Sequence, residues 1–456
     1  MYGRISKVHF IGIGGIGMSG IAEVLINQGY TVSGSDLKSS KITDRLKSLG
    51  ARVYIDHDPR NIGDADVVVM SSAVGEDNCE VAASRERGIP VIPRAEMLAE
   101  LMRFKYGIAV AGSHGKTTTT TLVSSVLGAG GFDPTIVVGG RIENLGASAR
   151  VGKGDFIVVE ADESDGSFLT LSPAIAVVTN IDREHLDYYG GMDDLKSTFT
   201  DFLNKVPFYG LGIVGVDSQH VCSILPGLSR RFLTYGLSED AELRAHDVTS
   251  SGFKTSFRVS LRGGELGTAV LTLPGRHNAQ NALAAIAVGM ELGMSFDQIK
   301  AGLGDWQRIE RRLQVKGERC GVKIIDDYGH HPEEIRVTLQ AVKDAFKPKR
   351  IIVVFQPHRY TRTKYLFDDF VKVLSKTDIL YILDIYPAGE SPIDGLSAEL
   401  MCDAVALSGH RRVYFEPEFS RVIESVSEVL EPEDVVLTLG AGNVWKVAEG
   451  LVTTPA

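Results

Sequence analysis

The chain has 456 residues, which is too many for one ordinary hydrophobic core and suggests about three domains. Hydrophobic residues make up 44% and charged residues 23% of the sequence, as is usual for a soluble globular protein. The formal net charge of −10 makes the chain a poor general binder of nucleic acid or of an anionic membrane. Positive groups gathered in a cleft could still bind an anionic ligand.

The cysteine pattern and the apolar runs indicate the compartment. The four cysteines lie far apart and none forms a CxxC pair, so a zinc site is not expected. The N-terminus begins with a strand-like run rather than the apolar stretch of a signal peptide. The sequence contains no run of about 18 apolar residues, the length needed to span a bilayer. We therefore expect a cytoplasmic protein with no membrane and no nucleic-acid partner.

Apolar β-branched runs alternate with helical patterns along the chain, which predicts an α/β fold with largely parallel sheets. The first block opens with a strand over 7–11, a glycine turn and a helix over 17–27. Further strands are predicted over 31–33, 66–70 and 90–92. The block ends near 103–106, so we expect an N-terminal Rossmann-like domain over 1–106.

Two more blocks follow. A strand over 107–110 opens a central P-loop ATPase-like domain, predicted over 107–311, with strands over 155–160, 174–179 and 210–216. The stretch 232–273 alternates apolar and polar residues between turn signals, which indicates added antiparallel strands, and a helix is predicted over 278–293. The C-terminal domain, over 312–456, is again Rossmann-like. Its strands are predicted over 323–326, 350–355, 379–383 and 434–439.

The most specific motif is Gly-Ser-His-Gly-Lys-Thr-Thr-Thr-Thr over 112–120, between a short strand and a helical pattern. Glycines let backbone N–H groups curl around phosphate oxygens, and a helix N-terminus adds unsatisfied donors. Lys116 supplies a cation for the outer phosphates, and Thr117 supplies a hydroxyl for a bridging Mg²⁺. The usual pattern has glycine where Val110 stands, so this loop has a different length or shape. A threonine-rich helix start with a coincidental Gly-Lys is the alternative.

Two strand ends offer metal ligands beside this loop. Glu160 ends one predicted strand and opens an acidic run over 160–165, and the next strand leads to His185. The carboxyl ends of parallel strands meet at one edge, and oxygen ligands next to phosphate suit Mg²⁺. We therefore predict that Thr117, Glu160 and His185 hold Mg²⁺. A solvated acidic loop and a packing histidine are the alternatives.

A second glycine loop, over 12–17, matches GxGxxG after a strand, and Asp36 stands where a ribose-binding acid is expected. Alone, this pattern indicates an NAD-dependent oxidoreductase. The diphosphate of a nucleotide sugar would satisfy the same loop. Ser71 and Ser72 follow a third strand and could add donors to the crevice. Glycines that only allow tight strand–helix packing are the structural alternative.

Basic residues follow two strands near the C-terminus. His358, Arg359 and Arg362 make a good carboxylate receptor, because the guanidinium fork binds a carboxylate bidentately. Paired histidines at 330–331 precede a proline that suits the first turn of a helix. A surface basic loop and a histidine helix cap are the alternatives.

In this order the motifs resemble those of the Mur ligases of bacterial cell-wall synthesis, over essentially the whole chain. The resemblance is carried by residues 12–17, 112–120, 160–168, 180–187, 274–281, 311–312, 327–332 and 356–363. It implies one domain for a UDP-sugar, one for ATP and one for an amino acid. It further implies an ATP-dependent ligase that joins the lactyl carboxylate of UDP-N-acetylmuramate to L-alanine through an acyl phosphate. Such a protein would serve peptidoglycan precursor synthesis as a monomer or a homodimer.

The resemblance also assigns residues by position. The catalytic residues would be Lys116, Arg312 and His185. ATP would contact Gly112, Ser113, His114, Gly115, Lys116, Thr117, Thr118, Asn278, Asn281, Arg312 and Asp327. The UDP-sugar would contact Gly12, Gly14, Gly15, Ile16, Gly17, Asp36, Ser71 and Ser72. Alanine would be bound by Tyr328, His358, Arg359 and Arg362.

One departure and three alternatives remain. Several Mur ligases carry a carbamylated lysine beyond the metal histidine, but residues 197–200 here contain none and only Lys196 is close. A second metal held by a carbamate is therefore not expected. A peptide-recycling ligase that adds a preformed peptide to the same sugar stays open. So do an NAD-dependent oxidoreductase and a P-loop ATPase without ligation.

Overall fold

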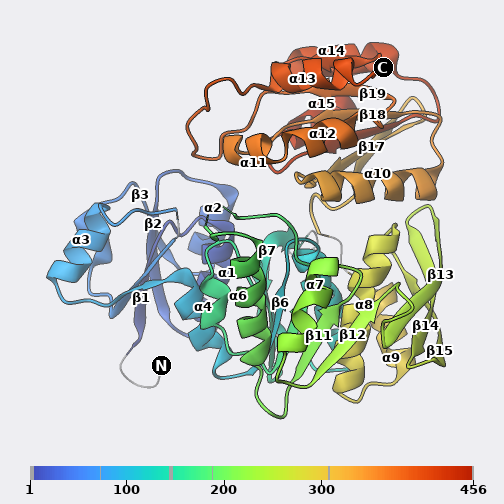
Figure 1. Cartoon of the computed structure of the whole chain (residues 1–456). Helices are drawn as coiled ribbons and strands as arrows, with labels where there is room; N and C mark the ends of the chain where they lie inside the picture. The colour runs from blue at the N-terminus through green and yellow to red at the C-terminus, as the bar shows by residue number, and fades with distance from the viewer. Residues whose placement is uncertain (1–4, 72, 143–146, 187, 307–308, 454–456) are drawn as a thin grey trace. The chain divides into compact units, whose positions relative to one another are not determined.

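The computed structural model describes residues 5–71, 73–142, 147–186, 188–306 and 309–453, and confirms a three-domain α/β architecture. Its three sheets lie in two compact units, which we describe separately (Figure 1). The first unit comprises residues 1–248, 256–271 and 279–307, and holds the N-terminal sheet and the central sheet except for part of two of its strands. The second unit comprises residues 249–255, 272–278 and 308–456.

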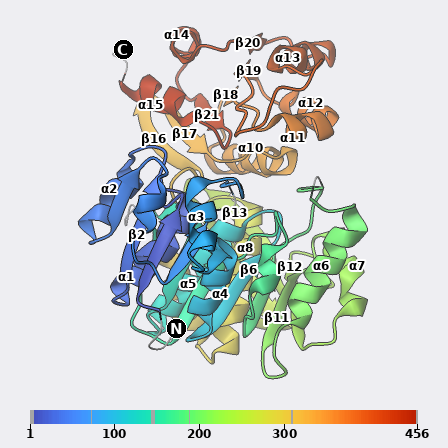
Figure 2. The same cartoon turned by 90° about the vertical axis from the view of Figure 1, so that its left-hand side faces the viewer.

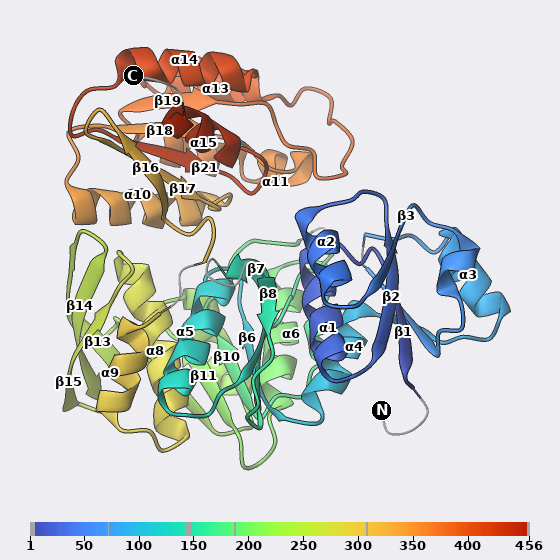
Figure 3. The same cartoon turned by 180° about the vertical axis from the view of Figure 1, so that it is seen from behind.

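The N-terminal sheet has five parallel strands in the order β3-β2-β1-β4-β5. These are β1 (Lys7–Ile11), β2 (Thr31–Asp36), β3 (Arg52–Ile55), β4 (Val67–Met70) and β5 (Val91–Pro93). The helices are α1 (Ile16–Asn27), α2 (Lys41–Ser48), α3 (Cys79–Glu86), α4 (Arg94–Met102) and the 3₁₀ helix η1 (Pro59–Ile62). Helices α1, α2 and α4 cover one face and α3 covers the other (Figure 3). This doubly wound arrangement confirms the predicted Rossmann-like domain, and β3 is a strand that the sequence pattern missed.

The central sheet has ten strands in the order β15-β14-β13-β12-β11-β10-β6-β9-β7-β8. Its parallel core consists of β6 (Tyr106–Ala111), β9 (Phe156–Glu160), β10 (Ile175–Val178) and β11 (Leu211–Gly215). On the far side of β9 lie β7 (Thr135–Ile142) and β8 (Ala147–Arg150), which pair antiparallel and were not predicted. Helix α1 of the N-terminal domain packs against β7 and β8, as Figure 3 shows. The two domains of this unit therefore share an interface.

The predicted added strands are present, with one correction. They are β12 (Phe232–Gly236), β13 (Leu243–Ser251), β14 (Lys254–Leu261) and β15 (Gly264–Leu271). The short connections after β13 and β14 require antiparallel pairing. Strand β12 differs, because it pairs parallel with both β11 and β13. The antiparallel addition therefore begins one strand later than expected.

Helices cover both faces of the central sheet. On one face α5 (Lys116–Ala129), α8 (Arg276–Glu291) and α9 (Phe296–Gly304) pack together, because Gly289 of α8 lies close to both Val126 and Ile299. On the other face lie α6 (Met192–Asn204) and α7 (Gln219–Ile224), with η2 (Ser167–Thr170) and η3 (Leu225–Gly227) beside them (Figure 1). Phe168 of η2 packs with Phe199 and Phe202 of α6 in a buried aromatic cluster. These layers hold the carboxyl ends of β6, β9 and β10 at one edge.

The C-terminal sheet has six strands in the order β16-β17-β21-β18-β19-β20. They are β16 (Gln314–Arg319), β17 (Val322–Asp327), β18 (Ile351–Phe355), β19 (Ile379–Ile382), β20 (Val413–Phe415) and β21 (Val435–Leu439). All of its pairings are parallel except that of β16, a polar edge strand that the sequence pattern missed, as it did β20. The mixed sheet confirms the Rossmann-like class of the last domain.

Alternate residues of the C-terminal strands face two cores. One core contains Ile325, Val353 and Leu437, and α10 (Pro332–Phe346), α12 (Phe367–Leu374) and α13 (Ala398–Leu407) pack there. The other contains Ile324, Val354 and Val436 under α14 (Phe419–Val429) and α15 (Trp445–Thr453), while α11 (Tyr360–Tyr365) follows β18 (Figure 2). Among the described helices, none combines the length and apolar composition needed to cross a bilayer.

Candidate active site

The phosphate loop connects β6 to α5 and depends on two glycines. Gly112 has a φ of 130° and Gly115, the N-cap of α5, has a φ of 80°, a region that residues with a Cβ rarely adopt. A Cβ at position 112 would lie 2.1 Å from Oγ1 of Thr179, and one at position 115 would lie 2.7 Å from Oδ1 of Asn281. The loop therefore has the conformation that the motif requires, and Asn281, a predicted ATP-binding residue, lies against it.

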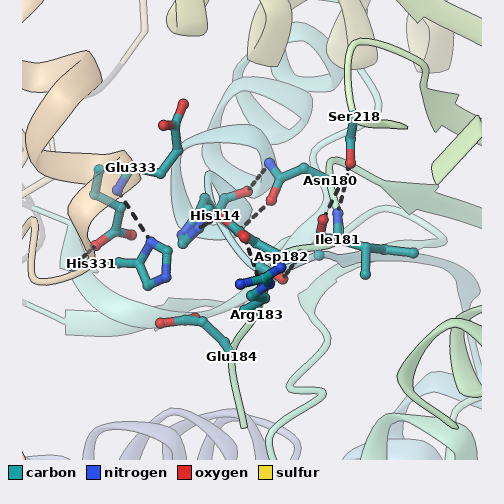
Figure 4. A network of polar contacts seen from close by, with 12 residues as sticks. His114, Asn180, Ile181, Asp182, Arg183, Glu184, Ser218, His331 and Glu333 are labelled. Carbon is teal, nitrogen blue, oxygen red and sulfur yellow. Dashed lines mark hydrogen bonds and ion pairs between the residues drawn. The ribbon is translucent and has the colours of Figure 1, made fainter. Parts of the chain in front are cut away.

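The segment after β10 fixes the loop in place (Figure 4). The backbone N–H of His114 donates to Oδ1 of Asn180 at 2.8 Å, and the N–H of Ser113 donates to the Asn180 carbonyl at 3.0 Å. In return the N–H of Asp182 donates to Oγ of Ser113 at 2.8 Å. The ring of His114 also lies 3.2 Å from the Asp182 carboxylate. The amides of Ser113 and His114 bind Asn180 and so hold the shape of the loop.

Lys116 is the first residue of α5 and forms a buried ion pair. Its ammonium lies 2.8 Å from both carboxylate oxygens of Glu163 and donates to the Gly112 carbonyl at 2.7 Å. Burial opposes the charge of Lys116, but Glu163 and neighbouring carboxylates outweigh burial and raise its pKa. Burial raises the pKa of Glu163 to about 7, against the effect of Lys116. Lys116 is therefore a firmly charged cation, and Glu163 is a carboxylate close to its titration point.

The predicted metal ligands fall into two adjacent groups. The Thr117 hydroxyl donates to Glu160 at 2.9 Å, and the same carboxylate oxygen of Glu160 accepts the N–H of Gly139 at 2.8 Å. His185 lies 3.9 Å from Glu163 and from Glu184, and these three side chains are close enough to hold one metal ion. Lys196 lies 3.6 Å from Asp193 on α6. Oxygen and imidazole ligands thus stand beside the phosphate loop.

The N-terminal glycine loop is held by β2. Gly12 has a φ of 79° and its N–H donates to the Ser35 carbonyl at 2.9 Å, while the N–H of Gly14 donates to Oδ2 of Asp36 at 2.8 Å. Gly15 is the N-cap of α1, and Ile16, at the helix start, is 41% exposed. The Asp36 carboxylate thus supports the loop itself. Ser71 lies against Gly12, whereas the predicted contact residue Ser72 lies outside the described residues.

Arg94, at the start of α4, is a cation that the sequence motifs did not single out. Its guanidinium would lie 3.2 Å from a Cβ at Gly17 and is 3.4 Å from the Asp162 carboxylate. It therefore joins the glycine loop to the acidic run that follows β9. Only its place just after a short strand, at the edge where ligands bind, could have indicated it.

The predicted amino-acid pocket is built from strand ends in the second unit. The His358 ring stacks on Tyr386 at 5.4 Å and faces His330 at 5.8 Å, and Arg362 lies 3.4 Å from Nδ1 of His358. Burial, followed by His330 and the nearby arginines, lowers the pKa of His358 to about 3. The imidazole is therefore neutral within a cationic cluster. Tyr386 and His330 are members that sequence reasoning did not assign.

The remaining predicted residues of this pocket contact neighbouring segments. Arg359 has a φ of 69° and lies 3.9 Å from Glu390, and Tyr328 has the guanidinium of Arg312 over its ring at 5.4 Å. His331 caps α10, since the N–H of Glu333 donates to its Nδ1 at 3.3 Å (Figure 4). The cap interpretation is thus confirmed for His331.

Two predicted ATP ligands of the second unit have structural contacts. The Asp327 carboxylate accepts the N–H groups of Leu313 and Gly329, each at 2.8 Å, and burial raises its pKa. Asn278 donates to the Pro274 carbonyl at 2.7 Å. Through its bond to Leu313, Asp327 fixes the backbone next to Arg312.

His277, next to Asn278, gives a pH prediction. Burial, followed by Arg312 and Arg336, lowers its pKa to about 4, whereas the unfolded side chain titrates near 6.5. Between these values the unfolded chain binds the proton more tightly, so stability falls as the pH drops below 6.5. We expect His277 to account for about 2 kcal/mol of the loss between pH 7.5 and 5.

Urea unfolding at both pH values checks this expectation. His277→Gln should lose about 2 kcal/mol less than the wild type over that interval. An equal loss in both proteins would contradict the assignment.

Comparison with known proteins identifies the family. Residues 7–106 match the Mur ligase family, catalytic domain, residues 110–289 match the Mur ligase middle domain, and residues 311–442 match the Mur ligase, glutamate ligase domain. The chain belongs to the Mur ligase family.

Individual relatives cover nearly the whole chain. The protein of Geobacter sp. (strain M21) named UDP-N-acetylmuramate--L-alanine ligase is 56% identical over 452 residues, which is 99% of this chain and 98% of the relative. The crystal structure of UDP-N-acetylmuramate-alanine ligase from Thermotoga maritima superposes with a TM-score of 0.84 at 28% identity and covers 98% of both chains. A UDP-N-acetylmuramate:L-alanyl-gamma-D-glutamyl-meso-diaminopimelate ligase from Neisseria meningitides has a TM-score of 0.62 at 30% identity. It covers 67% of this chain and 100% of its own.

Proposed function

We propose that this chain is an ATP-dependent ligase that joins the lactyl carboxylate of UDP-N-acetylmuramate to L-alanine, in peptidoglycan precursor synthesis. The observation that carries the proposal is the full-length similarity, at 56% identity, to a protein named for this reaction. The phosphate loop with Lys116 supports it, because activation of a carboxylate by ATP needs a cation at the outer phosphates. We place the reaction in the cytoplasm.

Phosphate binding and the charge on the transferred group fall to the central domain. Glu163 now contacts Lys116 with both oxygens, as a phosphate would. We infer that the outer phosphates of ATP replace Glu163 at the ammonium, with the amides at the start of α5 as further donors. The sugar carboxylate then attacks the γ-phosphorus, ADP leaves, and an acyl phosphate forms.

Thr117 and Glu160 fit a Mg²⁺ ion. Their oxygens meet at 2.9 Å beside the phosphate loop, and hydroxyl and carboxylate oxygens are ligands that this ion accepts. His185, with Glu163 and Glu184, would complete the donor set. When bound, Mg²⁺ would neutralise charge on the phosphate oxygens. Thr117, which would hold the ion, is the neighbour of Lys116, so both cations would act on the same phosphates.

Amine attack falls to the C-terminal domain. Arg359 and Arg362 would bind the carboxylate of alanine, with the neutral His358 imidazole beside Arg362. The amine attacks the acyl phosphate carbonyl, and the tetrahedral intermediate collapses with release of phosphate. We assign Arg312, which the resemblance places in catalysis, to the γ-phosphate.

The second candidate is a ligase that adds a preformed peptide to the same sugar. The likeness to the Neisseria meningitides protein favours it, but that likeness covers 67% of this chain at 30% identity. The alanine ligase similarity extends over 99% of the chain at 56% identity. We therefore place L-alanine first.

Phosphate release tests the choice. With ATP, Mg²⁺ and UDP-N-acetylmuramate present, we expect release with L-alanine and much less with the L-alanyl-γ-D-glutamyl-meso-diaminopimelate tripeptide. Omission of the sugar nucleotide or of the amino acid should abolish release. Release without both substrates would indicate a P-loop ATPase, and preference for the tripeptide would establish the peptide ligase.

A further inference from the structure

A buried polar network lies beneath the N-terminal glycine loop and plays no part in the reaction described above. Its centre is Glu80, the second residue of α3, whose side chain is fully buried. One carboxylate oxygen accepts from the Ser35 hydroxyl at 2.6 Å and lies 3.1 Å from Nε2 of His9. The other accepts from the Asn61 amide at 2.8 Å and from the N–H of Asp58 at 3.0 Å. A buried carboxylate with four polar partners joins β1, β2, η1 and α3.

Two paths lead from Glu80 to the glycine loop. The first runs through Ser35, because the Ser35 carbonyl accepts the N–H of Gly12 at 2.9 Å and the N–H of Ile13 at 3.0 Å. Glu80 holds the Ser35 hydroxyl, which also lies 2.9 Å from Nδ1 of His57. The amides of Gly12 and Ile13 therefore bind Ser35, and among the described contacts Ser35 is joined to α3 through the Glu80 carboxylate.

The second path runs through the segment after β3. Glu80 binds Asp58 and Asn61, and the Asn61 amide also donates to the Asp56 carbonyl at 3.1 Å. The N–H of Asp56 donates in turn to the Asp36 carbonyl at 2.9 Å. The Asp36 carboxylate accepts the N–H of Gly14 at 2.8 Å. Both paths thus end on amides that fix the shape of the glycine loop, whose residues the family resemblance assigns to the UDP-sugar.

We propose that Glu80 is a positioning residue for the UDP-sugar site, which sets the glycine loop through Ser35 and Asp36 without touching the ligand. This inference rests on the proposed function for the identity of the ligand. A binding loop that is misplaced by a fraction of an ångström loses affinity, so the residues that hold it contribute to binding. The ATP site lies in the central domain, and none of the described contacts of Glu80 leads there.

Glu80→Gln tests the proposal in the full chain. The glutamine keeps the shape but replaces one of the two acceptor oxygens by an NH2 donor, so the two partners on that side must change their hydrogen bonds. We expect binding of UDP-N-acetylmuramate, measured by calorimetry, to weaken about tenfold, while ATP binding and kcat at saturating substrate stay near those of the wild type. Ser35→Ala, which keeps the backbone carbonyl, should give a smaller loss. Because both changes act through one network, the loss in the double variant should be less than the sum.

A matched control separates positioning from stability. The Asp66 carboxylate accepts the N–H groups of Ser6 and Lys7 at the other end of β1, at 2.7 and 2.9 Å. Asp66→Asn should lower the thermal midpoint of the protein but leave the affinity for UDP-N-acetylmuramate unchanged. Unchanged affinity in Glu80→Gln and Ser35→Ala, or an equal loss of UDP-sugar and ATP binding, would overturn the inference. A wild type that binds ATP but not UDP-N-acetylmuramate would instead overturn the proposed function.

Discussion

Lys116→Ala should lower kcat for phosphate release roughly a thousandfold, because the variant loses the cation that stabilises charge on the transferred phosphoryl group. The change also leaves Glu163, whose side chain is 1% exposed, buried without its ammonium partner. Burial already raises the pKa of Glu163 to about 7, so this carboxyl should take up a proton in the variant rather than unfold the domain. The measurement is steady-state phosphate release together with the thermal midpoint.

Two further variants make this result specific. Lys116→Ala combined with Glu163→Gln should regain stability but not activity, which separates catalysis from the buried charge. Lys105→Ala removes a lysine that precedes β6, at the opposite edge of the central sheet, and should retain activity. Near-normal release by Lys116→Ala would refute the role of the phosphate loop.

Arg311→Ala should destabilise the C-terminal domain by about 3–5 kcal/mol, because it leaves the fully buried Asp326 without its charged partner. Nε of Arg311 lies 2.9 Å from Asp326, and the guanidinium also donates to the carbonyls of Gly440, Ala441 and Gly442. One side chain thus ties the end of β17 to the turn after β21. Urea unfolding monitored by tryptophan fluorescence measures the loss.

The neighbouring arginine is the natural comparison. Arg312→Ala should lower activity and cost less stability than Arg311→Ala. Both guanidinium groups lie over the Tyr328 ring, but Arg311 also forms a hydrogen-bonded ion pair with the fully buried Asp326. Arg311→Ala combined with Asp326→Asn should recover much of the lost stability. Equal stability losses for the two single alanine variants would contradict this division of roles.

The strong periodic elements could be predicted from the sequence, and the polar edge strands could not. The buried strands β6, β9 and β18 read as largely continuous apolar runs, which parallel strands covered on both faces produce. Strand β16 is mostly polar and lies at the edge of its sheet, and β7 contains Gly139 and Gly140, so neither shows that pattern. The parallel pairing of β12 depends on its place in the sheet, which local alternation does not indicate.

In the candidate site, too, some residues could be predicted from the sequence and others could not. Glycine and lysine spacing identified the phosphate loop, because those residue types are needed for its shape and charge. The partner of Lys116 could not be predicted, since Glu163 is 47 residues away and meets it only after β9 pairs with β6. Arg94 and Tyr386 could not be predicted for the same reason, because they meet Asp162 and His358 only in the folded chain. Roles assigned by resemblance, such as those of Asp36 and Asp327, gain local contacts here that the motif did not indicate.

The composition of the second compact unit bears on where the chain can be cut. Its residues 249–255 and 272–278 come from the central part of the sequence, yet they pack on α10. The N–H of Gly252 donates to the Ala345 carbonyl at 2.9 Å, Phe253 meets Phe346 edge to face, and Gly275 lies against Ala341. A fragment that begins at the proposed 311/312 boundary would leave these surfaces of α10 bare. The second compact unit is thus discontinuous in sequence, because residues 249–255 and 272–278 cover part of α10.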